Sequence, residues 1–247
     1  GLEARARLSR TLQGLDPDAS TERDIRVEEL PDQDWNRQWA QSVKPIRIGR
    51  RIVIRPSWEP AVLQAQDIEI VLDPKQAFGT GHHETTRMLL EWLEDLVHGG
   101  ESVLDVGTGS GILAMVALRL GASSAFGVEC DPVAVDCARD YAAENGFGDH
   151  LAFRCGTLEA IYRQGVLRPD LFLANPDRPA LSLLCDALAQ YVRHGARLLV
   201  SGILHDQEQE IVRAFSKVGA MLSQRREQDG WVALELLMVE SCEGVGA

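Results

Sequence analysis

The feature that most constrains the fold is the stretch 102–120, where a short apolar run leads into a glycine-rich turn and then into a helix. Residues 102–106 (SVLDV) read as a strand, and residues 107–111 (GTGSG) place a glycine at every second position. Residues 112–120 have the apolar composition of a buried helix. A strand, a glycine turn and a helix in this order let the backbone approach a ligand closely and direct helix N–H groups at it.

Two acids accompany this motif at the ends of consecutive predicted strands. Asp105 comes directly before the glycine turn, and Glu129 ends the next apolar run. A carboxylate at the end of the second strand can accept hydrogen bonds from both hydroxyls of a ribose. The motif therefore predicts a ribose-containing cofactor and makes Asp105, Gly107, Gly109 and Glu129 candidate cofactor-binding residues.

Strands and helices alternate through the rest of the chain. The predicted strands after the motif are 125–129, 151–155, 170–174 and 197–201, and the predicted helices are 132–145, 158–164, 180–191 and 206–218. Two last strands, 220–228 and 231–240, are joined by Asp229-Gly230, a dipeptide typical of hairpins. This order predicts an α/β fold with a doubly wound, mostly parallel sheet closed by an antiparallel hairpin. Ligands bind at the carboxyl ends of such strands, where Gly107, Glu129, Gly156 and Asn175 should gather with Asp105.

The chain upstream of this core divides into two further segments. Residues 1–30 hold one predicted helix and one predicted strand, which are too few for a core, so we interpret them as the end of a small α+β domain whose beginning is absent. Residues 31–60 are interpreted as a connector with Trp35 and Trp39 and a basic hairpin, and residues 61–247 as the main domain. The segment from Lys44 to Arg55 carries five cations and no acid. It is either an exposed hairpin with basic outward side chains or a contact surface for nucleic acid or an acidic partner.

Composition excludes several classes of protein. The net charge of −12 argues against strong binding to nucleic acid. The five cysteines contain no Cys-x-x-Cys pair, so we expect neither a zinc site nor a disulfide framework. No apolar run approaches the roughly 18–20 residues of a membrane span. These features favour a reduced, cytoplasmic protein without a membrane segment or a metal.

The glycine spacing distinguishes between cofactors. A dinucleotide site needs a third glycine at position 112, where this chain has Ile112. The pattern Asp-x-Gly-x-Gly-x-Gly, together with Glu129, instead resembles the first motif of class I methyltransferases. That resemblance implies a Rossmann-like, seven-stranded fold and S-adenosyl-L-methionine as the cofactor.

A closer resemblance extends from about Asp32 to Val239. The runs DWNRQW (34–39), RPSW (55–58), LDPKQAFGTG (72–81) and SGIL (201–204) are similar to those of bacterial ribosomal protein L11 methyltransferases. The resemblance implies methylation of lysine or α-amino groups of a ribosomal protein. It also implies a small α+β substrate-recognition domain ahead of the catalytic one, which residues 1–30 resemble in part.

The resemblance also assigns residues by position. Thr86, Gly107, Glu129 and Asn175 match the family's cofactor contacts. Phe78 and Thr80 match the loop that covers the methionine end of the cofactor. Asn175 is in addition the catalytic candidate, because its side-chain oxygen can accept a hydrogen bond from a neutral amine and direct the lone pair of that amine.

Two departures from the family pattern leave alternatives open. The loop reads His82-His83-Glu84 where the family has Thr-His-Pro, and His83 is interpreted either as a structural hydrogen-bonding residue or as a proton carrier. Residues 176–179 (PDRP) replace apolar residues after Asn175, which leaves the acceptor open. The alternatives to methylation of a ribosomal protein are methylation of another protein or a small molecule, and a cofactor-binding docking module with little catalysis.

Overall fold

The computed structural model describes residues 43–73, 77–162, 169–176, 180–181, 184–185, 187 and 195–239. The chain divides into two compact units, 1–42 and 43–247, and all described residues belong to the second. The predicted domain remnant 1–30 and the two connector tryptophans lie outside the described residues. The predicted division into three segments therefore stays a prediction.

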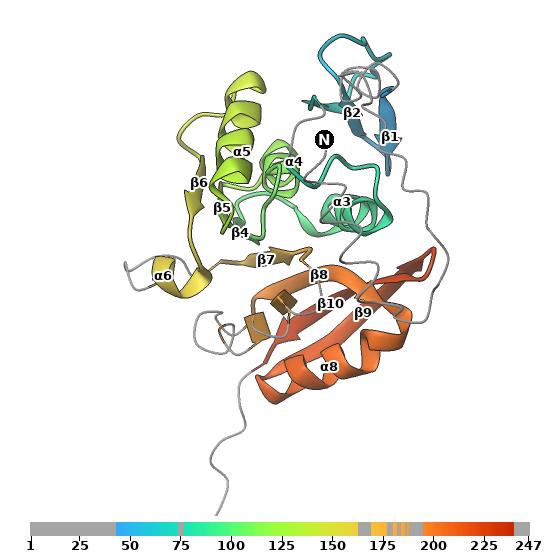
Figure 1. Ribbon diagram of the computed structural model, residues 1–247. Coiled ribbons are helices and arrows are strands. Elements are labelled where there is room, and N and C mark those ends of the chain that lie inside the picture. Colours follow the sequence, from blue (N-terminus) through green and yellow to red (C-terminus); the bar gives the residue numbers. More distant parts are fainter. Residues whose placement is uncertain are drawn as a thin grey trace, which may run out of the picture. The chain divides into compact units, whose positions relative to one another are not determined.

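The main sheet has seven strands, as the sequence predicted (Figure 1). The strands are β4 (Ser102–Val106), β5 (Ser124–Glu129), β6 (Leu151–Cys155), β7 (Leu171–Ala174), β8 (Arg197–Leu204), β9 (Ala220–Gln228) and β10 (Trp231–Met238). Their order is β6-β5-β4-β7-β8-β10-β9, and β10 runs antiparallel to both of its neighbours whereas the other pairings are parallel. In the turn between β9 and β10, Asp229 and Gly230 have positive φ values of 50° and 80°, as a type I′ hairpin turn requires.

The strand order reverses beside β4. The chain moves from β4 outward to β5 and β6, and then returns to β7 on the other side of β4. Val106, the last residue of β4, pairs with Val128 of β5 and with Ala174 of β7. The segments that follow these three strands therefore emerge side by side, which is the place where ligands bind in open α/β sheets.

Helices cover both faces of this sheet (Figure 1). On one face, α3 (Glu84–Leu96), α4 (Ile112–Leu120) and α5 (Pro132–Glu144) bury a continuous apolar cluster that includes Trp92, Leu113 and Tyr141. On the other face, α6 (Leu158–Tyr162) and α8 (Glu208–Lys217) contribute Leu158, Ile211 and Phe215 to a second cluster. Burial of these aliphatic and aromatic side chains, about 1.5–3 kcal/mol for each, is the main force that holds the layers together.

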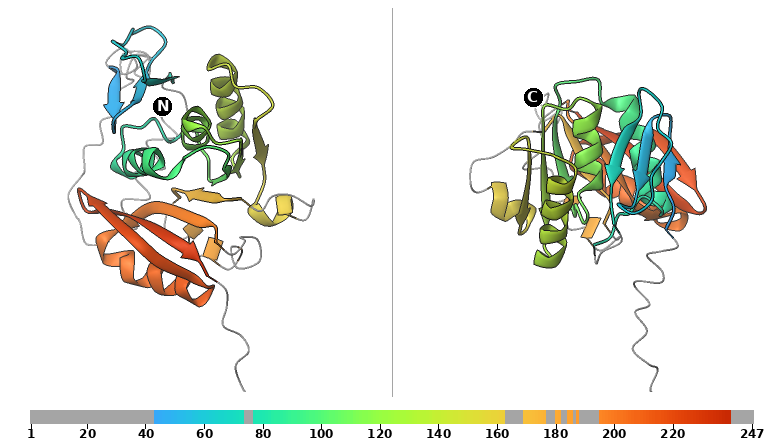
Figure 2. Two further views of the ribbon diagram at one scale, coloured as in Figure 1. Left: turned by 180° about the vertical axis from the view of Figure 1, so that it is seen from behind. Right: turned by 90° about the horizontal axis from the view of Figure 1, so that it is seen from above.

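A second, three-stranded sheet packs against the helices α3 and α4 (Figure 2). It comprises β1 (Ile46–Ile48), β2 (Ile52–Arg55) and β3 (Ile68–Val71). β1 and β2 form the predicted hairpin, whereas β3 pairs with β2 in parallel. Ile48, Ile52 and Ile70 are completely buried in the same cluster as α3 and α4, so the hairpin is part of the main compact unit.

Most element boundaries lie within two residues of those predicted, and the end of β8 differs most. β8 continues to Leu204 because Ile203 and Leu204 still pair with Val232 and Trp231 of β10, a long-range contact without a local signal. The helix predicted from 206 is a short 3-10 turn, His205–Gln207, followed by α8. In the described part of the chain, no helix is long and apolar enough to cross a membrane.

Candidate functional site

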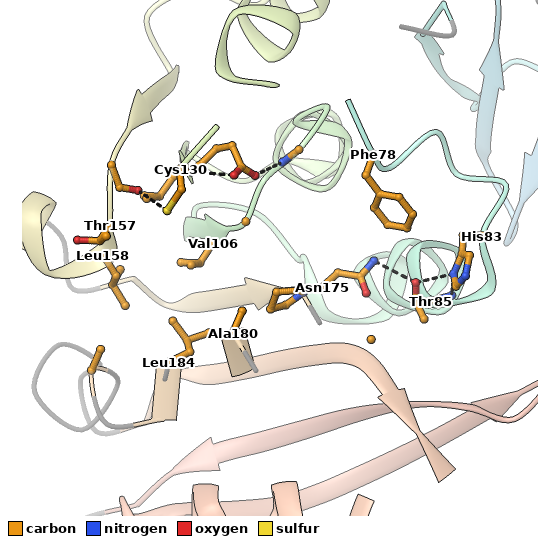
Figure 3. A pocket seen from close by; sticks show the side chains of 18 of the residues that line it. Phe78, His83, Thr85, Val106, Cys130, Thr157, Leu158, Asn175, Ala180 and Leu184 are labelled. Atoms are coloured by element: carbon orange, nitrogen blue, oxygen red, sulfur yellow. Dashed lines mark hydrogen bonds between the residues drawn. The ribbon is translucent and has the colours of Figure 1, made fainter. Parts of the chain in front are cut away.

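A pocket of about 1150 Å³ opens at the carboxyl ends of β4, β5 and β7. Thr157 and Leu158 line one end, His83 and Thr85 line the other, and Asn175 lies between them (Figure 3). The volume exceeds the minimum of about 300 Å³ that is typical of small-molecule sites. The pocket therefore has room for a nucleoside cofactor and for part of an acceptor.

The glycine turn forms the floor of the pocket and has the left-handed backbone that its glycines allow. Gly107, Gly109 and Gly111 have φ values of 68°, 53° and 79°. A Cβ atom on Gly107 would lie 3.7 Å from the Cβ atom of Pro176, another lining residue, and would occupy part of the pocket. A Cβ atom on Gly109 would lie only 2.6 Å from the carbonyl oxygen of Phe78. The turn thus needs glycine both to admit a ligand and to accept the Phe78 loop.

The loop that carries Phe78 is hydrogen-bonded to the glycine turn. The Ser110 backbone N–H donates to the Phe78 carbonyl oxygen at 2.9 Å, and the Ser110 hydroxyl donates to the Gly79 carbonyl oxygen at 2.6 Å. The Phe78 side chain is 59% exposed at the edge of the pocket. Its position therefore depends on the same turn that lines the pocket.

Glu129 lines the other side of the pocket with its carboxylate held by backbone groups. Oε1 accepts hydrogen bonds from the N–H groups of Cys130 at 2.7 Å and Asp131 at 3.1 Å. Oε2 accepts one from the N–H group of Gly109 at 3.2 Å. Because a carboxylate has about four acceptor positions, one remains for a ribose hydroxyl before any of these bonds rearranges. This arrangement fits the ribose of S-adenosylmethionine.

Asp105 lies beneath the turn rather than at the pocket. It is 1% exposed, and its Oδ2 accepts a hydrogen bond from the Thr108 hydroxyl at 2.6 Å. Burial raises the pKa of Asp105 to about 7, and the charge of Glu129 adds to this rise, although hydrogen bonds from Thr108 and the Ala114 backbone oppose it. Asp105 therefore supports the turn from below.

Asn175 follows β7 and is held by the first turn of α3. Its Nδ2 donates to the Thr85 hydroxyl at 3.2 Å and to the Thr86 hydroxyl at 3.1 Å. Its Oδ1 is buried and has no hydrogen-bond partner within the described structure. A buried amide oxygen without a partner at the wall of a pocket is an acceptor available to a ligand.

His83 connects this region to the aromatic side chains of the pocket. It caps the N-terminus of α3, since its Nδ1 accepts a hydrogen bond from the Thr85 backbone N–H at 3.3 Å. Its ring meets those of Phe78 and Trp231 edge to face, with centroids 5.7 Å and 5.1 Å apart. This geometry supports the structural interpretation of His83.

Five of the eight candidate site residues line the pocket: Phe78, Gly107, Gly109, Glu129 and Asn175. Gly156, which was also expected at this edge of the sheet, lines it too. Thr80, Thr86 and Asp105 do not. Thr80 contacts His82 at 3.3 Å, and Thr86 lies 1% exposed behind Asn175. The order of strands predicted the first group because strand ends converge, but it does not specify which side chains turn inward.

Other lining residues were not predicted from the sequence. Leu204 and Trp231 are partners in the antiparallel pairing of β8 with β10, so only the closing hairpin brings them to the pocket. Cys130 follows Glu129 directly and could have been found from that neighbour; burial and the nearby charge of Glu129 raise the pKa of its thiol. The departure at 177–179 lies outside the described residues.

Most of the positive charge of the hairpin is compensated within the fold. Arg47 donates two hydrogen bonds to Asp67, at 2.7 Å and 2.6 Å, which hold the pKa of that carboxyl at about 2. Ion pairs involve four of the five cations: Lys44–Glu59, Arg47–Asp67, Arg50–Asp95 and Arg55–Glu69. The interpretation as an exposed hairpin is favoured over a free cationic surface.

Comparison with known proteins identifies relatives over nearly the whole chain. The family model of ribosomal protein L11 methyltransferase (PrmA) matches residues 3–238. The protein of that name from Symbiobacterium thermophilum is 38% identical over 205 residues, 83% of this chain and 66% of the relative. The one from Azotobacter vinelandii is 43% identical over 85% of this chain and 70% of its own length. The chain thus spans about two thirds of the length of these relatives.

Solved structures agree with this relationship. The crystal structure of the ribosomal protein L11 methylase from Lactobacillus delbrueckii subsp. bulgaricus has a TM-score of 0.74 and 28% identity, and the match covers 80% of this chain and all of that one. An RNA methyltransferase from Salinibacter ruber in complex with S-adenosyl-L-homocysteine has a TM-score of 0.51 and 17% identity, over 65% of this chain and 97% of that one, which indicates a shared fold alone. The fold class, the S-adenosylmethionine-dependent class of enzyme and the family predicted from the sequence are confirmed. The chain belongs to the ribosomal protein L11 methyltransferase family.

Proposed function

We propose that this chain transfers methyl groups from S-adenosylmethionine to amino groups of a protein, and that ribosomal protein L11 is the acceptor. The observation that carries the proposal is the free Oδ1 of Asn175 in a pocket whose opposite end holds the carboxylate of Glu129. The names of the relatives support the choice of acceptor. We also propose that the protein acts in the cytoplasm, because its proposed acceptor is a ribosomal protein.

The described residues fit the proposed cofactor. Glu129 accepts hydrogen bonds from the ribose, and Gly107 leaves room for the chain of the cofactor between the turn and Pro176. When bound, S-adenosylmethionine supplies a methyl group on a positively charged sulfur. We propose that Phe78 covers this end of the pocket and excludes water.

The acceptor amine must be neutral before its lone pair can attack. A lysine amine in water has a pKa of about 10.4 and is protonated at neutral pH. Phe78, Leu204 and Trp231 form an apolar surface at the acceptor end, which disfavours the charged ammonium form. Among the described lining residues, the carboxylates are those of Glu129, the last residue of β5, and Glu159 on α6. The amine therefore loses its proton to solvent as it enters.

Asn175 then orients the neutral amine. Its Oδ1 accepts one N–H of the amine, which turns the nitrogen lone pair toward the methyl group. An acceptor placed in this way contributes through geometry, because a shift of about 1 Å in a reacting group can cost about 100-fold in rate. We name Asn175 as the catalytic residue.

The test is methyl transfer from radiolabelled S-adenosylmethionine to purified ribosomal protein L11, followed by mass spectrometry of the labelled residues. We expect label in L11, and we expect Asn175→Ala to remove most of the turnover. Label in another protein or in small molecules of a cell extract, with none in L11, would overturn the acceptor. Tight cofactor binding with no transfer to any acceptor would favour a docking module.

A further inference from the structure

Three hydrogen-bonding groups of residues that line the pocket form a chain: the Asn175 amide, the Thr85 hydroxyl and the His83 imidazole (Figure 3). Asn175 Nδ2 lies 3.2 Å from Thr85 Oγ1, which lies 2.8 Å from His83 Nδ1. Thr86 Oγ1 accepts the second N–H of the amide at 3.1 Å. Both threonines are buried, with 2% and 1% of their surfaces exposed.

The cap of α3 fixes the direction of these hydrogen bonds. His83 Nδ1 accepts the backbone N–H of Thr85, so this nitrogen carries no proton. The contact between the imidazole and the Thr85 hydroxyl must therefore have the hydroxyl as donor. With its proton used in this way, Thr85 Oγ1 can offer Asn175 only lone pairs, and the group of the amide that faces it must be the NH₂.

The opposite orientation of the amide would defeat the proposed chemistry. A flipped side chain would present N–H donors to the acceptor amine, whose own N–H groups need an acceptor if the lone pair is to stay free. It would also place Oδ1 against the lone pairs of Thr85. The orientation of one amide thus depends on residues at the start of a helix.

We infer that Thr85 and Thr86, with His83 behind Thr85, are positioning residues that hold Oδ1 of Asn175 toward the acceptor amine. This inference rests on the proposed function for its effect on rate. It assigns to the two hydroxyls a role in turnover that acts through Asn175, because both accept hydrogen bonds from its amide.

The test compares substitutions that differ by the hydroxyl. Thr85→Val and Thr86→Val keep the shape of the side chain and remove the hydroxyl, whereas Thr85→Ser and Thr86→Ser keep it. Since a hydrogen bond of this kind contributes about 0.5–1.5 kcal/mol, each valine variant should lower kcat about 2- to 13-fold. The double valine variant should lower kcat by about 10-fold or more, since both N–H groups of the amide lose their partners.

The serine variants should keep kcat near that of the wild type. Ser102→Ala is the matched control. Its hydroxyl donates to Asp170 at 2.7 Å at the amino end of β4, away from the pocket. This control should lower stability without lowering kcat.

Nitrogen NMR of the histidine rings is an independent measurement of the direction of the chain of hydrogen bonds. At neutral pH, His83 should have an unprotonated Nδ1 and a protonated Nε2. A proton on Nδ1 would overturn the inference, whether or not the protein is active.

The kinetic outcomes separate this inference from the proposed function. Unchanged kcat in the double valine variant, together with loss of turnover in Asn175→Ala, would overturn the positioning role and leave the function standing. Absence of methyl transfer by the wild-type protein would instead overturn the function, and the NMR measurement would still decide the direction of the hydrogen bonds.

Discussion

Replacement of Gly202 by alanine should displace the segment that carries Asn175. Gly202 lies on β8 with φ = 79°, and an added Cβ atom would meet the Pro176 carbonyl oxygen at 2.1 Å and Asn175 Oδ1 at 3.4 Å. The left-handed backbone costs alanine about 1–2 kcal/mol. The contact with Pro176 must open by about 1 Å, at a cost of about 1–3 kcal/mol if it behaves as overpacking in a core. We expect the free energy of unfolding to fall by about 2–5 kcal/mol in total.

The same displacement should lower turnover. A shift of about 1 Å in the segment that holds Asn175 is sufficient to reduce kcat by up to about 100-fold. The measurements are urea denaturation for stability and methyl transfer at saturating cofactor and acceptor for kcat.

Gly195→Ala is the control for the cost of placing alanine in a left-handed backbone conformation. Gly195 has φ = 82°, and an added Cβ atom would have no neighbour within 4 Å. This variant should lose only about 1–2 kcal/mol and keep its kcat. Equal losses of stability in the two variants, together with normal turnover in Gly202→Ala, would refute the conclusion that contact with Pro176 positions Asn175.

Three other predictions concern carboxylates that accept hydrogen bonds within the fold. Asp105 has a pKa of about 7 in the folded protein against 3.8 as the reference value, so the folded state keeps its proton longer than the unfolded state. The stabilisation from this proton is complete below about pH 4 and is lost as the pH rises to about 7. Asp105→Asn should remove the part of this loss that falls between pH 5 and pH 8, at most about 3 kcal/mol, as measured by unfolding curves at the two pH values. Glu129→Ala should weaken S-adenosylmethionine binding by about 10-fold or more in calorimetry, since it removes a charged acceptor, and unchanged affinity would contradict the ribose role. Glu94→Ala should lower the free energy of unfolding, measured in urea, by about 2–4 kcal/mol. The Glu94 carboxylate accepts hydrogen bonds from the backbone N–H groups of Arg50 at 2.8 Å and Arg51 at 2.7 Å, and both groups would lose their partner. Glu91→Ala, on the same helix, is the control and should change stability little.

Local patterns in the sequence predicted much of the fold. The glycine turn, the alternation of strands and helices and the Asp229-Gly230 turn each reflect a rule that acts over a few residues, and all three are found in the structure. The second sheet was not predicted as such, since β3 joins β2 by parallel pairing across a connection that leaves no local signal. The ion pairs of the hairpin were not predicted for the same reason, since Asp67 and Asp95 are distant in sequence from the arginines they pair with.

The sequence predicted part of the site, and geometry explains why some of its residues were found and others were not. Sequence order alone predicts that Gly107, Glu129 and Asn175 meet, because parallel strands in a doubly wound sheet end at the same edge. The sequence also predicted the cofactor, since Ile112 excludes the dinucleotide spacing and the glycine motif with Glu129 resembles that of class I methyltransferases. Only the tertiary structure decided that Asp105 is buried below the turn, that Trp231 reaches the pocket, and that Thr85 and Thr86 take both N–H groups of Asn175. The physical reason is that hydrogen-bond direction and burial depend on atoms brought together from distant parts of the chain, whereas a sequence pattern records only what is near along it.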